Sequence, residues 1–261
     1  MQRIRTMGAL AVAIIAGACD KGTGPSNSLD TDLDADVAVV AANSVAEDAD
    51  AMRNPGMPTT SAAAVSGDFQ LGVCTFSAVA GRFTCPVKTF GGLTFTRSYA
   101  FFAVGGAPMS LFDALLTASA NLQSGVSGEV NRGHWRATIE WNRDFTVSGL
   151  AGEETSWTWN GTGSGSIEGS RHKHGDTERT YNLSTNTTVT NVVVPRSEGA
   201  YPTSGTVTVA VELSVVGGER DGENFTRTVT VTFDGTQSAR VLVGGAKFKV
   251  NLATRAVVKE D

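Results

Sequence analysis

The sequence predicts an all-β fold, an antiparallel up-and-down meander of about 10–12 long strands. From Asp68 onward apolar and polar residues alternate, which is the period of strands with one buried face. Turn residues interrupt the alternation repeatedly, and 30 of the 261 residues are glycine. Several runs reach about 15 residues, or about 50 Å, so the sheet must coil into a strongly curled open sheet or a closed barrel. A two-layer β-sandwich is the alternative.

The first residues carry the features of an export signal. Arg3 and Arg5 precede an apolar run over residues 7–15, which is too short to span a bilayer as a helix. Residues 1–18 are therefore predicted to be a signal peptide, and the protein is expected to leave the cytoplasm.

The end of this segment, Ala16-Gly17-Ala18-Cys19, resembles the lipobox of bacterial lipoproteins, although that family usually has leucine where Ala16 stands. The resemblance covers about the first twenty residues. It implies that Cys19 is lipidated after cleavage and that the protein is anchored to a membrane of the bacterial cell envelope. The same residues fit an ordinary A-x-A cleavage site, so a secreted soluble protein is the alternative.

Once Cys19 is assigned to lipid, Cys74 and Cys85 remain as an even pair in an oxidising compartment, and we expect a disulfide between them. In an antiparallel hairpin this pairing places Phe76 opposite Phe83 on the same face.

Residues 19–66 are acidic, rich in Ala, Ser and Asp and poor in aromatic residues, which is typical of a tether. Asp34 and Asp36 suit the start of a short helix there, and Asn54-Pro55-Gly56 would end it. Apolar residues fall near helical spacing at Val37, Val40, Ala41, Val45 and Met52. Our interpretation is a marginal helix on a mobile tether. The alternative is that its apolar stripe docks on the β domain, residues 67–261.

The net negative charge lies in the N-terminal part of the chain. Residues 1–50 contain three Lys or Arg against eight Asp or Glu, whereas residues 51–261 contain 18 of each kind. A neutral β domain lacks the basic patch that nucleic-acid binding requires, so we expect no nucleic-acid partner.

Early in the β domain, Leu93, Phe95, Tyr99 and Phe101 form one apolar face. Residues 109–123 predict a brief helical turn, opened by a capping box over residues 110–113, and then a strand. Near the C-terminus a three-residue loop at residues 234–236 would pair Val231 with Ala239 and Val229 with Val241.

Residues 157–167 contain Asn160-Gly161, a strong hairpin signal. A turn there would fold Trp157 and Trp159 against polar residues, so we predict one continuous strand instead. The preceding strand, residues 135–147, has apolar side chains at nearly all odd positions.

A fold at residues 151–152 would join these two strands. It brings Trp141 opposite Gly161 or Gly163, and Trp135 opposite Ile167 or Gly169, so that indole rings cover strand glycines. The alternative is that the glycines leave a groove for a ligand.

Arg143 is a charged residue on this apolar face, where an unpaired guanidinium is costly to bury. We expect it to stack on Trp157 or Trp159, or to lie at an open rim. In the alternative, Arg143, Trp141, Trp157 and Trp159 contact the polar end of an amphipathic ligand.

Catalytic and metal-binding signals are weak. His172, His174 and Asp176 have the spacing to chelate a transition metal, but Arg171 and Lys173 oppose a cation there, so we predict no metal site and no cofactor. The sequence has no nucleophile elbow, no phosphate-binding glycine loop and no paired carboxylates in a defined strand context. We therefore predict a protein without catalytic residues, which is not an enzyme.

Three functions fit these observations. The first is a cell-envelope lipoprotein whose curled sheet binds a lipid or other apolar ligand, since a wide barrel must flatten, take a plug or hold a ligand. The second is a structural or interaction scaffold with a filled core, acting through its Thr/Ser-rich outer face on a partner that the sequence does not identify. The third is a transmembrane β-barrel, against which the lipobox, Arg143 and the lack of a terminal aromatic residue all count.

Overall fold

The computed structural model describes residues 27–53, 74–132, 135–171, 179–217 and 221–260. Within these residues one helix, α1 (Asn27–Arg53), precedes a sheet of fourteen antiparallel strands. The strands are β1 (Thr75–Ser77), β2 (Arg82–Thr84), β3 (Lys88–Phe90), β4 (Leu93–Ala103), β5 (Pro108–Met109), β6 (Thr117–Arg132), β7 (Trp135–Ser148), β8 (Ser156–Arg171), β9 (Arg179–Pro195), β10 (Ser204–Val216), β11 (Asn224–Thr232), β12 (Ser238–Val243), β13 (Ala246–Asn251) and β14 (Val257–Lys259).

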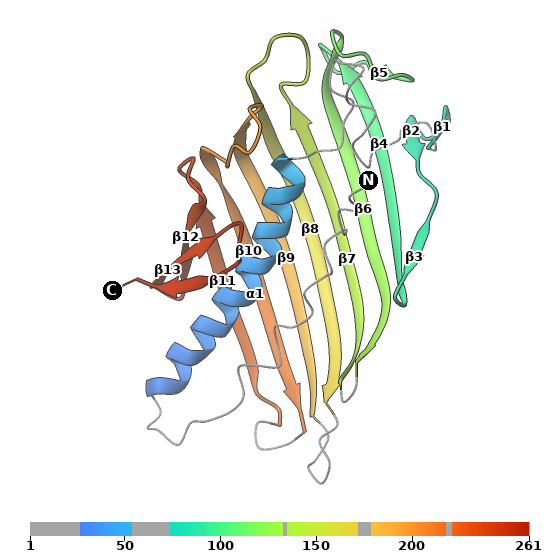
Figure 1. The fold of residues 1–261 in the computed structure, drawn as a ribbon. Coiled ribbons are helices and arrows are strands. Elements are labelled where there is room, and N and C mark those ends of the chain that lie inside the picture. Colours follow the sequence, from blue (N-terminus) through green and yellow to red (C-terminus); the bar gives the residue numbers. More distant parts are fainter. Residues whose placement is uncertain (1–26, 54–73, 133–134, 172–178, 218–220, 261) are drawn as a thin grey trace, which may run out of the picture.

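The sheet is an up-and-down meander. Its order follows the chain from β1 to β14, except that the short β3 and β5 both pair with β4. The sheet is open and curls around α1, which lies across its concave face (Figure 1). The predicted all-β antiparallel meander is therefore confirmed, in its open and curled form rather than as a closed barrel. Short edge strands raise the strand number above the expected range.

The docking of α1 corrects the interpretation of this segment. The helix packs chiefly against β10–β14, and Val37, Val45 and Met52 are buried in the interface. Five alanines of α1 are also buried, and their small side chains let the helix lie close to the sheet. A marginal helix on a mobile tether is thus wrong for residues 27–53, and the docked alternative holds. The helix begins earlier than predicted, and it ends at Arg53, as the following Pro-Gly pair predicts.

β8 is one continuous strand, as predicted, but its register with β7 differs from the expected one. Trp141 lies opposite Gly165 rather than Gly161 or Gly163, and Trp135 lies opposite Arg171. The reason is the connection, which spans residues 149–155 instead of turning at residues 151–152. Leu150 is buried there, and its N–H donates to the carbonyl of Ala118, so the connection is drawn into the core.

Two other connections also differ from prediction. The predicted brief turn before the strand exists, but it lies at residues 114–116 and the capping box at residues 110–113 does not open it. The Asp113 carboxylate accepts hydrogen bonds from the N–H groups of Leu115 and Leu116, its carbonyl accepts one from Thr117, and β6 starts directly afterwards. The β11–β12 loop spans residues 233–237, so Val231 pairs with Val241. Phe233 is buried within this loop, which accounts for its greater length.

The first hairpin is as predicted. Cys74 and Cys85 form a disulfide with Cα atoms 3.9 Å apart. Phe76 pairs with Phe83 across β1 and β2, and their ring centroids lie 5.0 Å apart.

Candidate functional site

A buried polar cluster joins α1 to the middle of the sheet. Arg143 on β7 donates from Nε to Oδ1 of Asp48 over 2.8 Å and from Nη2 to Oγ of Ser44 over 3.0 Å. The side chains of Arg143 and Asp48 are only 12% and 6% exposed. Ser44 and Asp48 lie four residues apart on one face of α1, so both reach the same guanidinium. The charge on the apolar face is therefore neutralised by the protein's own helix.

Burial raises the pKa values of two acidic side chains of α1. It raises the pKa of Asp48 above its ordinary value, because the loss of hydration outweighs the attraction and the hydrogen bond of Arg143. Oδ2 of Asp48 has no hydrogen-bond partner in the described part of the chain. Burial likewise raises the pKa of Glu47, against the attraction of Arg255, which donates to Glu47 over 3.4 Å.

The C-terminal end of α1 is held by Arg53. Its guanidinium donates to the carbonyls of Ala200 and Gly199, over 2.8 and 2.9 Å, and lies 4.1 Å from the ring centroid of Tyr201. Two arginines of the sheet domain and one of the helix thus fix α1 at three places along its length.

The predicted ligand-contact residues are only partly brought together. Arg143 lies 5.1 Å from the ring centroid of Trp141, whereas the expected stacking on Trp157 or Trp159 is wrong. Trp157 is instead approached by Arg196, at 5.8 Å, and Trp159 is buried opposite Val192. The sequence did not reveal Asp48 as the partner of Arg143, although a carboxylate in the apolar stripe of a helix is a signal of such a pair.

Side chains fill the hollows beside the β8 glycines. A Cβ atom at Gly163 would lie 2.8 Å from Cδ of Arg143, and one at Gly165 would lie 2.8 Å from Oγ1 of Thr185 and 3.6 Å from the Trp141 ring. The predicted cover of strand glycines therefore exists, but at Gly163 it comes from Arg143, with Trp141 placed over Gly165.

A second apolar cluster lies on the concave face and contains no residue of α1. It consists of Leu93, Val130, Ala137 and Ile139, with the half-buried Trp141 against it. The indole Nε1 atoms of Trp141, Trp157 and Trp159 are buried without a hydrogen-bond partner in the described residues. Such N–H groups are donors that a ligand on this face would satisfy.

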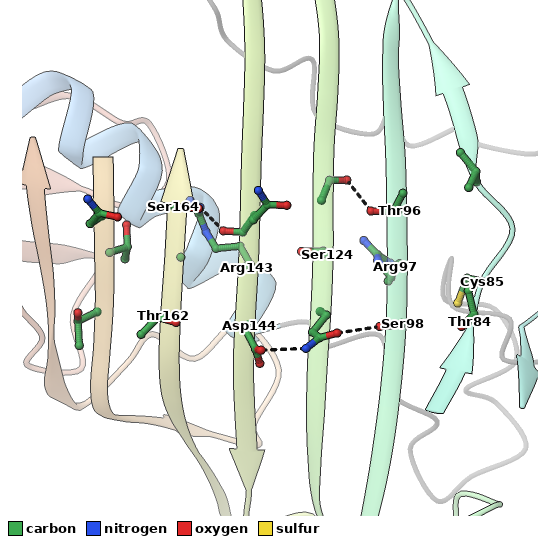
Figure 2. Close-up of a pocket in the computed structure, with 18 residues that line it drawn as sticks. Thr84, Cys85, Thr96, Arg97, Ser98, Ser124, Arg143, Asp144, Thr162 and Ser164 are labelled. Carbon is green, nitrogen blue, oxygen red and sulfur yellow. Dashed lines mark hydrogen bonds between the residues drawn. The ribbon is translucent and has the colours of Figure 1, made fainter. Parts of the chain in front are cut away.

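The opposite, outer face of the sheet carries a furrow of about 730 Å³ across β4 and β6–β9, and Thr84 of β2 with Cys85 and Val87 closes one end of it. One ridge is formed by Ser98, Gln123, Asp144, Thr162 and Thr188, which pair in sequence across the strands. The other ridge is formed by Thr96, Asn142, Ser164 and Asn186, and the side chains of Thr96 and Asn142 close over Gly125 between them. Figure 2 looks onto this face, with α1 behind the strands.

The carboxylate in the furrow is held by neighbouring amides. Asp144 accepts hydrogen bonds from Asn121 over 2.6 Å and from Gln123 over 2.9 Å, and Arg82 donates to Asn121 over 2.7 Å. The alternation in the sequence places these residues on the polar face, but it gives no sign that this part of the face is hollowed.

Several predicted sites lie outside the described residues. These are Cys19, the proposed lipidation site, and the metal-ligand candidates His172, His174 and Asp176. Within the described ranges no group of His, Cys, Asp and Glu residues is placed to hold a metal ion. No helix in those ranges has the length and apolar character to cross a membrane.

No protein-family model, curated protein or solved structure matches the chain. The functional argument therefore rests on the geometry of the two faces of the sheet.

Proposed function

We propose that the protein is a non-catalytic lipoprotein of the bacterial cell envelope whose curled sheet is an interaction scaffold. Its core is filled by its own helix, and it acts through the outer face. The observation that carries this proposal is the pairing of Asp48 with Arg143, because it places a charged helix residue where a free concave face would receive an amphipathic ligand. A residue pair that is built into the chain needs no ligand to neutralise it.

The membrane anchor is part of this proposal and rests on the lipobox-like residues that end at Cys19. Replacing Cys19 by alanine should release the protein from membranes, because no acyl chain would then be attached. Fractionation of cells that produce each form, with mass spectrometry of the N-terminal peptide, measures this. A wild-type peptide without acyl mass, together with a membrane-bound variant, would show that the lipoprotein assignment is wrong.

A lipid carrier is the second candidate. It is favoured by the apolar cluster around Ile139 and by the unpartnered indole of Trp141, both on the concave face and both outside the packing of α1. A ligand there would lie beside α1 rather than in its place.

Native mass spectrometry of the mature chain with Cys19→Ser separates the two candidates. The filled scaffold predicts a single species without bound lipid, since the concave face is occupied by side chains. The carrier predicts a stoichiometric lipid mass that Trp141→Ala removes. Thr138→Ala, an exposed change on the other face of β7, is the matched control and should leave either result unchanged.

A further inference from the structure

We propose that the outer-face furrow binds a neutral, hydroxyl-rich chain, an oligosaccharide segment that lies across the strands. This inference rests on the proposed function of an interaction module that acts through its outer face. It names the site on that face and the chemical class of its ligand.

The shape of the furrow suits an extended chain. Its two ridges lie two residues apart along each strand, which is about 7 Å, and it crosses five neighbouring strands, which is about 19 Å. The backbone of the row Arg97, Ser124, Arg143, Gly163 and Thr187 forms its floor. The furrow is therefore a long, narrow channel rather than a round pocket.

The charge of the furrow disfavours ionic ligands. Asp144 is the one carboxylate among the described side chains of its two ridges. Its two oxygens already accept hydrogen bonds from the side-chain amides of Asn121 and Gln123. Arg97 and Arg143 line the floor only through their backbone, because the register turns their side chains to the concave side. Arg82 donates to Ser98 of the same ridge over 3.2 Å and offsets the charge of Asp144, so an anionic polymer would meet no net positive charge.

The chemistry of the ridges also disfavours lipids and peptides. Neither ridge carries a large apolar side chain, and Val87 at one end is the one such side chain among the described residues that line the furrow, so an acyl chain would find no continuous apolar track across the strands. A peptide that adds as a strand needs a free sheet edge, whereas β6–β9 are paired on both sides.

Hydroxyl-rich chains match the groups that remain. Thr162, Ser164, Asn186 and Thr188 are exposed, and their side chains make no hydrogen bond to other described residues, so their hydroxyl and amide groups are available. Hydroxyls and amides both donate and accept hydrogen bonds, as sugar hydroxyls do. The fixed Asp144 carboxylate adds an oriented acceptor at the centre of the furrow (Figure 2).

The test uses the mature chain with Cys19→Ser and three probes, cellohexaose, chitohexaose and isomaltohexaose, with dextran sulfate as the anionic comparison. Isothermal titration calorimetry should detect binding of at least one neutral probe. Asn186→Ala and Asp144→Ala should each weaken that binding by about tenfold, which corresponds to about 1.4 kcal/mol and to the loss of one or two hydrogen bonds.

Thr228→Ala is the matched control, because Thr228 lies in the same cross-strand row as Asn186 but two strands further on, outside the furrow. It should leave the affinity unchanged, and thermal unfolding verifies that every variant is folded.

Three results would overturn the proposal: no binding of any neutral probe at millimolar concentration, preference for dextran sulfate, or binding that both furrow variants leave intact. If the neutral probes fail while the mature chain carries no lipid, the ligand class is wrong and the filled scaffold stands. A stoichiometric bound lipid would instead contradict the proposed function itself.

Discussion

Replacing Arg143 by methionine should lower the free energy of unfolding by about 3–5 kcal/mol at neutral pH. This is the largest effect that we expect from any single substitution. Methionine keeps most of the side-chain volume and the contact with Gly163 but removes the charge. Asp48, whose side chain is 6% exposed, would then be a buried carboxylate without a counter-charge. Denaturant unfolding, followed by tryptophan fluorescence, measures the loss.

Two control variants isolate the ion pair. Arg255→Met removes the partner of Glu47, but these side chains are 28% and 27% exposed, so water screens the pair and the cost should be about 0–1 kcal/mol. The double variant Arg143→Met/Asp48→Leu removes both buried charges and should regain most of the lost stability. Equal losses for Arg143→Met and Arg255→Met would contradict the role of the buried pair.

The cost of Arg143→Met should also depend on pH. The pKa of Asp48 is raised in the folded state, so the folded chain holds a proton on Asp48 more tightly than the unfolded chain does. The stability that this proton contributes is complete below the ordinary pKa of Asp and is lost as the pH rises through the raised pKa. Without Arg143 the carboxyl is easier still to protonate, so the deficit of the variant should shrink as the pH falls through that window. A deficit that is constant with pH would exclude Asp48 as its source.

The fold class could be predicted because it depends on local patterns. The alternation of β7 and β8 fixes which face each residue occupies, and this remains true although the register moved. The Cys74–Cys85 disulfide follows from residue counting and the aromatic pair beside it. The continuity of β8 follows from the cost of placing Trp157 and Trp159 against polar neighbours.

Long-range contacts could not be predicted in the same way. Arg143 and Asp48 lie 95 residues apart, and nothing near either residue identifies the other. The alanine-rich sequence of the helix has only a weak apolar stripe and is therefore typical of a tether, although its small side chains are what allow close docking. The registers of β7–β8 and β11–β12 depend on Leu150 and Phe233, which enter the core from loops.

The outer furrow could not be predicted from the sequence either. Alternation identifies Asp144, Ser164 and Asn186 as polar-face residues, as it does for many others on neighbouring strands. The furrow is lined by residues of β4 and β6–β9 together. No single strand forms it, so the site emerges only once the strands are assembled.

Gly163→Val should lower the free energy of unfolding by more than the added volume of the valine side chain explains. A Cβ atom at Gly163 would lie 2.8 Å from Cδ and 3.0 Å from Nη1 of Arg143, so valine must displace that side chain. Overpacking alone costs about 1–3 kcal/mol, and a displaced guanidinium also weakens its bond to Asp48. Thr162→Val, the neighbouring change on the outer face, should stay within about 0.5 kcal/mol.

A double-mutant cycle separates these two contributions to the cost of Gly163→Val. In the Arg143→Met/Asp48→Leu background there is no ion pair to weaken, so the valine should cost only the overpacking part. The loss of unfolding free energy caused by Gly163→Val in the wild-type background, minus its loss in the double-variant background, is the coupling energy between Gly163 and the ion pair. We expect about 0.5–3 kcal/mol, as for residues in contact. If Gly163 instead borders space for a ligand, valine would leave the denaturant midpoint unchanged in both backgrounds and would remove bound lipid. A coupling indistinguishable from zero, with stability lost equally in both backgrounds, would mean that Arg143 moves aside freely and that the pair with Asp48 does not depend on the glycine.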